Sequence, residues 1–175
     1  MMLTVEAYLR RGQRELRRLT LNPRVQLGMQ LAAWGAAGFF LSAARLGGFP
    51  LPMAMGAVCA AAGWRAVVMG LGAALGYGIF WGAGSFQPMV WSGLGTILAL
   101  FGGNRRETTD FPLLMPAAAA LVTAVTGLGF QILWQDDTPL RIYLLRTALA
   151  GLCADLVGEI RAALRQARGQ GAQTL

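Results

Sequence analysis

The chain has 175 residues, of which 55% are hydrophobic and only 13% are charged. Soluble domains carry about 25% charged residues, so this composition excludes an ordinary soluble protein and is typical of an integral membrane protein. The 24 glycines agree, because glycine is more frequent in membrane helices than in soluble ones. The net charge is +7, and every basic residue is an arginine. These arginines lie between apolar runs, which favours loop charge at a membrane surface and argues against binding to nucleic acid.

Charge-free apolar runs in the first part of the chain predict four membrane-spanning helices. Residues 25–44 form a run of the length that one span needs, about 20 residues. A short second helix is expected over residues 51–64, because the prolines of "GGFPLP" suit a loop and a first helical turn. The run 66–104 is too long for one span. "GAGSFQP", residues 82–88, is expected to divide it into helices at 66–81 and 88–101.

The second part of the chain predicts two more spans. Residues 111–135 form the clearer one, and the acidic turn "QDDTP" follows it. Residues 141–161 are apolar but carry Arg141, Arg146, Asp155 and Glu159. A helix lying on a membrane surface would gather its charges on one broad face, and this one does not. We therefore expect a short sixth span, followed by a flexible polar tail over residues 165–175.

The arginines predict the orientation, because cytoplasmic loops collect basic residues. Six spans with both ends in the cytoplasm place twelve of the fifteen arginines inside, and five spans place only nine there. The expected fold is therefore an all-α, polytopic bundle of about six transmembrane helices. It divides into a cytoplasmic arm at 1–24, the helix bundle at 25–164 and the cytoplasmic tail at 165–175.

The N-terminal arm is predicted to bind the membrane surface. Its apolar residues share one side of a helical wheel and its arginines take the other, as in helices that lie on anionic lipid. The alternative is a loosely structured tail that only sets topology. The residues assigned to surface binding are Arg10, Arg11, Arg14, Arg17 and Arg18.

Two charged side chains, Arg146 and Asp155, are expected inside the membrane. An arginine at such a depth suggests a functional site. The structural alternatives are that its side chain extends to the interface or that it pairs with Asp136 or Asp137 in the preceding loop.

Small residues indicate where helices pack. Gly72 and Gly76 form a G-x-x-x-G pattern in the expected third span, which lets two helix backbones approach closely. Cys59 and Cys153 lie in apolar runs and are expected to be small buried side chains. The sequence has no histidine and no spacing typical of a metal site or an activated nucleophile. We therefore expect no enzyme activity, no cofactor and no metal.

Three segments resemble the membrane region of the stage II sporulation protein E family, the sporulation phosphatase. They are "GFPLPMAMGAV" at 48–58, "WRAVVMGLGAALGYGIF" at 64–80 and "RRETTDFPLLMPAAAALVTAVTGLGF" at 105–130. The resemblance covers about residues 31–164 and rests on diffuse hydrophobic motifs. Family members have a longer membrane region and a metal-dependent phosphatase domain, whose aspartate motif this sequence lacks.

The resemblance implies a non-enzymatic, multi-pass anchor in the bacterial inner membrane, with a role in localisation and assembly at the sporulation septum. Its expected partners are anionic lipids and either further copies of the chain or other membrane proteins. The alternative is a small-solute-binding subunit like that of energy-coupling-factor transporters, which needs a polar pocket. The candidates for its lining are Trp81, Gln87, Trp91, Gln131 and Trp134.

Overall fold

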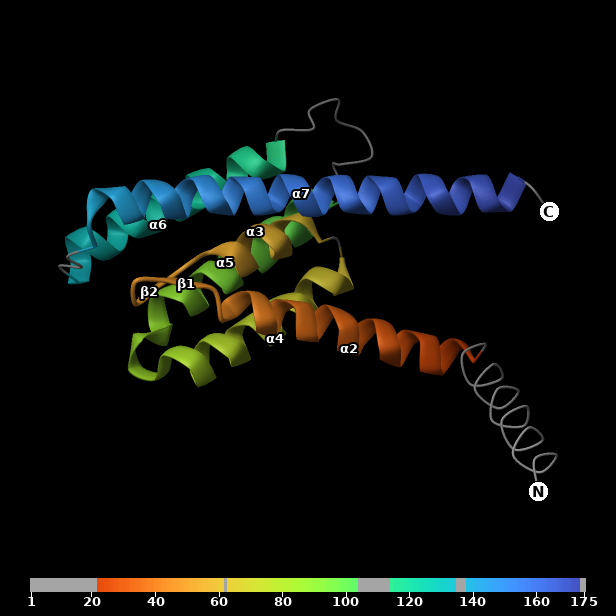
Figure 1. Cartoon of the computed structure of the whole chain (residues 1–175), viewed down its shortest axis with the longest axis horizontal. Coiled ribbons are helices and arrows are strands. Elements are labelled where there is room, and N and C mark those ends of the chain that lie inside the picture. The colour runs from red at the N-terminus through yellow and green to blue at the C-terminus, as the bar shows by residue number, and fades with distance from the viewer. Residues whose placement is uncertain (1–21, 62, 104–113, 135–137, 174–175) are drawn as a thin grey trace, which may run out of the picture. The chain divides into compact units, whose positions relative to one another are not determined.

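The computed structural model describes residues 22–61, 63–103, 114–134 and 138–173, and these are mostly helical, as Figure 1 shows. This confirms the all-α fold class. Two helical stretches, Trp64–Phe101 and Leu114–Trp134, are long and apolar enough to cross a membrane. The helices of the described residues are α2 (Pro23–Ser42), α3 (Met53–Ala60), α4 (Trp64–Trp81), α5 (Phe86–Gly103), α6 (Leu114–Trp134) and α7 (Leu140–Gln173).

The chain divides into two units, Met1–Ala33 and Trp34–Leu175. Within the first unit, the structure describes only residue 22 and the beginning of α2. The predicted arm at 1–24, with its five surface arginines, lies almost wholly outside the described residues. The second unit holds the rest of α2 and all later elements, and it contains every contact discussed below.

Most of the predicted helices begin and end within a few residues of the observed ones. The predicted break at residues 82–88 is a single 3-10 turn, η1 (Gly82–Ser85), between α4 and α5. The last helix differs more, because α7 has 34 residues and continues to Gln173, through most of the segment expected to be a flexible tail.

The second predicted helix is much shorter than expected. We expected a helix over residues 51–64, and α3 covers only the eight residues Met53–Ala60. A two-stranded hairpin, β1 (Arg45–Leu46) and β2 (Phe49–Pro50), precedes it. Gly47 and Gly48 form the turn with φ of 54° and 89°, a left-handed conformation that suits glycine. Pro52 disfavours a helical conformation at Leu51, so the helix cannot start earlier.

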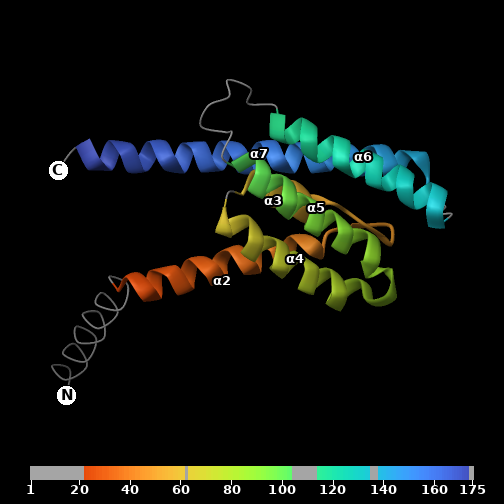
Figure 2. The ribbon, with the colours of Figure 1, turned by 180° about the vertical axis from the view of Figure 1, so that it is seen from behind.

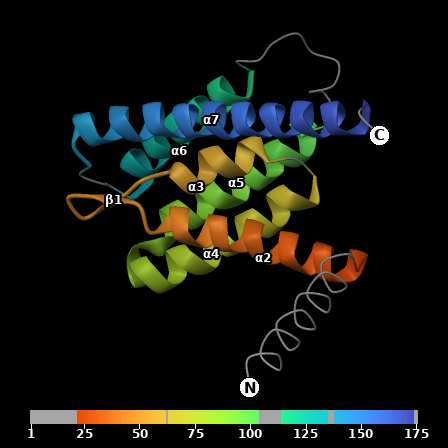
Figure 3. The ribbon, with the colours of Figure 1, turned by 45° about the vertical axis from the view of Figure 1, so that its right-hand side comes forward.

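Helix α3 lies at the centre of the second unit, between α7 on one side and α4 on the other (Figures 2 and 3). It also contacts α5 and α6. All residues from Ala54 to Ala60 are buried, and most have small side chains. A Cβ added at Gly56 would lie 2.8 Å from Cys153 Cβ, so α3 and α7 touch almost backbone to backbone. The core of the unit is therefore built around this short helix.

Successive elements run in alternating directions between two ends of the unit (Figure 1). At the hairpin end, the Trp81 indole donates to the Ser42 carbonyl at 3.2 Å, and the rings of Phe86 and Trp134 lie 5.8 Å apart. These contacts gather the ends of α2, α4 and α6 with the start of α5. The opposite end holds the connection between α3 and α4, and we call it the α3–α4 end.

Candidate functional site

Arg146 is the most unusual side chain in the described part of the chain, because it is a charged residue with only 4% of its surface exposed. It comes from the second turn of α7. Its Nε donates to the Pro50 carbonyl at 3.0 Å and its Nη1 to Thr138 Oγ1 at 3.4 Å. Its guanidinium also lies 5.7 Å from the Phe49 ring centroid and 5.2 Å from that of Trp91.

The arginine supports the extended segment that leads into α3. This segment is buried, and a buried carbonyl without a hydrogen-bond partner destabilises a fold by about 1–3 kcal/mol. Arg146 supplies the donor for Pro50, and the Tyr77 hydroxyl from α4 donates to the Leu51 carbonyl at 3.2 Å. Side chains of α4 and α7 thus replace the hydrogen bonds that a continuous helix would have made for itself.

A second arginine of α7 binds the other end of α3. Arg161 Nη1 donates to the Ala60 carbonyl at 3.2 Å, at the last residue of the helix. A cation there complements the partial negative charge at a helix C-terminus. Arg146 and Arg161 are separated by about 22 Å along α7, from the rise of 1.5 Å per residue. One helix therefore bonds both to the segment that leads into α3 and to the last residue of α3.

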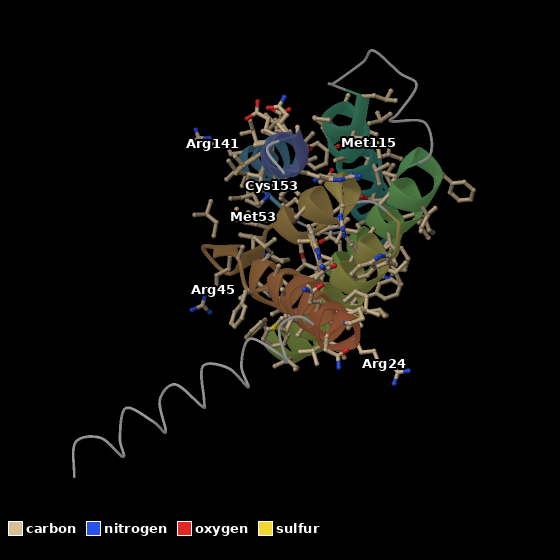
Figure 4. The ribbon with its side chains drawn as sticks, turned by 90° about the vertical axis from the view of Figure 1, so that its right-hand side faces the viewer. Arg24, Arg45, Met53, Met115, Arg141 and Cys153 are labelled. Atoms are coloured by element: carbon tan, nitrogen blue, oxygen red, sulfur yellow. The ribbon has the colours of Figure 1, made fainter. Side chains whose placement is uncertain are left out.

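The first structural alternative for Arg146, extension of its side chain to the interface, does not fit its burial. Its guanidinium does not extend to the surface of the unit, and protein groups surround it. In contrast, Arg45 and Arg141 point away from the bundle (Figure 4) and are exposed. A pairing with Asp136 or Asp137 lies outside the described residues.

Two other predicted site features fall elsewhere in the structure. Asp155 is half-buried on α7, and the described residues place no ion pair on it. Gly72 and Gly76 both face α2: a Cβ at Gly72 would overlap the backbone of Gly35, and one at Gly76 would lie 2.8 Å from the Phe39 carbonyl oxygen. These glycines pack helices within one chain.

The roles of Tyr77, Thr138 and Arg161 were not predicted from the sequence. Arg161 was interpreted as loop charge, although it contacts a carbonyl 101 positions earlier. Tyr77 contacts a carbonyl 26 positions earlier. No local pattern signals such pairs. The hairpin could have been predicted, since a Gly-Gly pair between two apolar residues is a recognised hairpin turn.

The residues considered for a solute pocket are mostly engaged in structural contacts. The Trp91 indole is fully buried and donates to Thr126 Oγ1 at 3.1 Å, and Gln131 Nε2 donates to the Thr138 carbonyl at 3.4 Å. Trp134 is exposed and stacks on Phe130, with their ring centroids 5.0 Å apart. Gln87 differs, because its amide nitrogen is buried and has no hydrogen-bond partner among the described residues.

The site is therefore a buried polar support for the extended segment before α3 and for α3 itself. Comparisons of the chain with protein-family models, with curated proteins and with solved structures give no match.

Proposed function

We propose that the chain is a multi-pass membrane protein that crosses the bilayer six times, with both ends in the cytoplasm, and that it acts as a non-enzymatic anchor. The observation that carries this proposal is the distribution of side chains on the helices. Large apolar residues point outward and small ones point inward, which is the reverse of a soluble helical domain.

Helices α4, α6 and α7 each show an outward apolar face. Three large residues of α4, Leu71, Leu75 and Ile79, are 61–70% exposed and share one side of the helix. The inward side carries Gly72, Ala73 and other small residues. Helix α6 exposes Leu121, Val125, Leu128 and Ile132, and α7 exposes Leu140, Leu144, Leu152, Leu156 and Ile160. Exposure of such faces to lipid chains has no hydrophobic cost, whereas exposure to water is unfavourable.

The second crossing in this proposal consists of the extended segment and α3 together. Eight helical residues cover about 12 Å, far less than the ~30 Å of a hydrocarbon core. The extended residues 49–51 add about 10 Å. Non-helical backbone at membrane depth is tolerated only where protein buries it. The bonds from Arg146 and Tyr77 to this segment meet that requirement.

The biological role follows from the resemblance to the membrane region of the sporulation phosphatase. We propose that the chain localises and assembles partner proteins, or further copies of itself, at the inner membrane of a sporulating bacterium. The dense packing around α3 supports a rigid anchor. A solute-binding transport subunit remains the second candidate, and the unpaired amide of Gln87 is the observation that favours it.

Reporter fusions after Leu175 test the topology of this proposal. A green fluorescent protein fused there should be fluorescent, because the proposed C-terminus is cytoplasmic, and the protein should stay in the membrane fraction after alkaline extraction. Alkaline phosphatase at the same position should be inactive. Active phosphatase with a dark fluorescent fusion would contradict the six-span topology.

The role itself needs a separate test. In a spore-forming host, the fluorescent fusion should gather at the sporulation septum, and an even distribution over the membrane would argue against the anchor role. A thermal-stability screen of the purified protein with vitamins and metal ions tests the second candidate. Strong stabilisation by one solute would favour a transport subunit over an anchor.

A further inference from the structure

Arg65 lies in a second arginine–aromatic cluster, at the α3–α4 end of the unit. It occupies the first turn of α4, and its guanidinium carbon lies 5.9 Å from the centroid of Trp34 and 5.6 Å from that of Trp64. Trp34 belongs to α2 and Trp64 begins α4. Two indoles from different helices therefore hold one guanidinium.

The donors of this guanidinium are not used within the described part of the protein. Contacts with the indole rings engage its face. Among the described residues, no carboxylate or carbonyl accepts a hydrogen bond from the side chain of Arg65, and the side chain is only half-buried. Arg146 differs on both counts, since it is buried and bonded to Pro50 and Thr138. Arg65 is thus a fixed cation that can still bind an anion.

The surroundings of Arg65 indicate the kind of anion. Trp64 is 40% exposed, and tryptophan gathers where a bilayer meets water. Leu71 and Leu75 lie seven and eleven positions further along α4, which places them on the same side of the helix as Trp64. They are 61% and 66% exposed. An anion with a long apolar chain could contact both the guanidinium and the exposed leucines, whereas a small soluble anion would contact only the guanidinium.

We propose that Arg65, Trp34 and Trp64 form a binding site for the phosphate of an anionic phospholipid, with an acyl chain lying along Leu71 and Leu75. The inference rests on the proposed membrane location, which puts this end at the cytoplasmic leaflet. That leaflet is rich in anionic lipid. The planar guanidinium donates two parallel hydrogen bonds to a phosphate, and the indoles keep it oriented for this.

Native mass spectrometry of the full chain in neutral detergent tests the site, with dioleoyl phosphatidylglycerol as the added lipid. Arg65→Gln should weaken binding of the first phosphatidylglycerol by at least about tenfold, because it removes the charge and the paired hydrogen bonds to the phosphate. Arg65→Lys keeps the charge but not the planar group with its paired donors. The affinity of this variant for phosphatidylglycerol should therefore fall between those of the unchanged chain and Arg65→Gln. Binding of dioleoyl phosphatidylcholine, which has no net charge, should be the same in all variants.

Arg45→Gln is the matched control, since Arg45 is an exposed arginine of β1 and lies at the hairpin end, away from Arg65. It should bind phosphatidylglycerol like the unchanged chain. Equal affinity of Arg65→Gln and the unchanged chain would overturn the proposal, and so would displacement of the lipid by an equal concentration of inorganic phosphate. Release of the unchanged chain from membranes by alkaline extraction would instead refute the proposed membrane location.

Discussion

At the scale of single residues, Arg146 shows how a charge can be placed in an apolar core. Its charge is spread over a planar group that lies near the Phe49 and Trp91 rings, and two of its nitrogens donate to oxygens. Such buried charges are stable only when partners satisfy them. The result is that the backbone segment before α3 depends on side chains from other helices, those of Arg146 and Tyr77.

Replacing Arg146 should therefore destabilise the fold. Arg146→Met keeps much of the volume but leaves the buried Pro50 carbonyl without this donor, at a cost of about 1–3 kcal/mol in the free energy of unfolding. Arg146→Lys should cost less, because an ammonium can still donate to one carbonyl. Unfolding by sodium dodecyl sulfate from neutral micelles, followed by tryptophan fluorescence, measures both.

The control is Arg141→Gln, in the first turn of the same helix. Arg141 is exposed, so its loss should change the free energy of unfolding by less than about 0.5 kcal/mol. If Arg146→Met were as stable as this control, Arg146 would not be a structural support.

At the scale of elements, the helices that make their own hydrogen bonds were predictable and α3 was not. Runs of apolar residues predicted α4, α5 and α6, because length and composition decide such helices. Helix α3 and its extended approach depend on Arg146 and Tyr77, which bond to carbonyls 96 and 26 positions away. Pro52 limits where the helix begins, but no local pattern indicated the distant donors that bond to the residues before it. The packing role of Gly72 and Gly76 was predicted, although its partner helix α2 was not.

The contact between α2 and α4 depends on the absence of side chains at its centre. At Gly72, the three atoms nearest to an added Cβ all belong to the backbone of Gly35, so Gly72→Ala must push the helices apart. We expect a loss of about 1–3 kcal/mol in the free energy of unfolding, as for other overpacked cores. The same detergent titration measures it.

Gly93→Ala provides the comparison for this change. Gly93 lies within α5, is exposed, and has no atom within 4 Å of an added Cβ. Alanine should be neutral there, or stabilise the helix by up to about 1 kcal/mol. Equal effects at Gly72 and Gly93 would show that the close approach of α2 and α4 does not require glycine at Gly72.

At the scale of the whole molecule, the arginines that the six-span proposal assigns to opposite sides of the membrane lie at opposite ends of the second unit. Six crossings with both ends in the cytoplasm would place Arg45 and Arg141 on one side of the membrane and Arg65 and Arg161 on the other. In the second unit, the elements that carry Arg45 and Arg141 meet at the hairpin end, where Arg146 joins α7 to β2 and to Thr138. Arg161 binds Ala60 at the α3–α4 end. Six crossings in a bilayer would give this separation.

The central claim is that the segment from the hairpin to the start of α4 crosses the membrane despite having only eight helical residues. Labelling of single introduced cysteines in intact cells with a maleimide that cannot cross the inner membrane tests it directly. Leu46→Cys and Trp64→Cys flank the segment at positions that are 44% and 40% exposed. The unchanged chain, with Cys59 and Cys153, gives the background labelling. The account predicts that Leu46→Cys is labelled from outside and that Trp64→Cys is labelled only after the cells are opened. Labelling of both positions from the same side would contradict it.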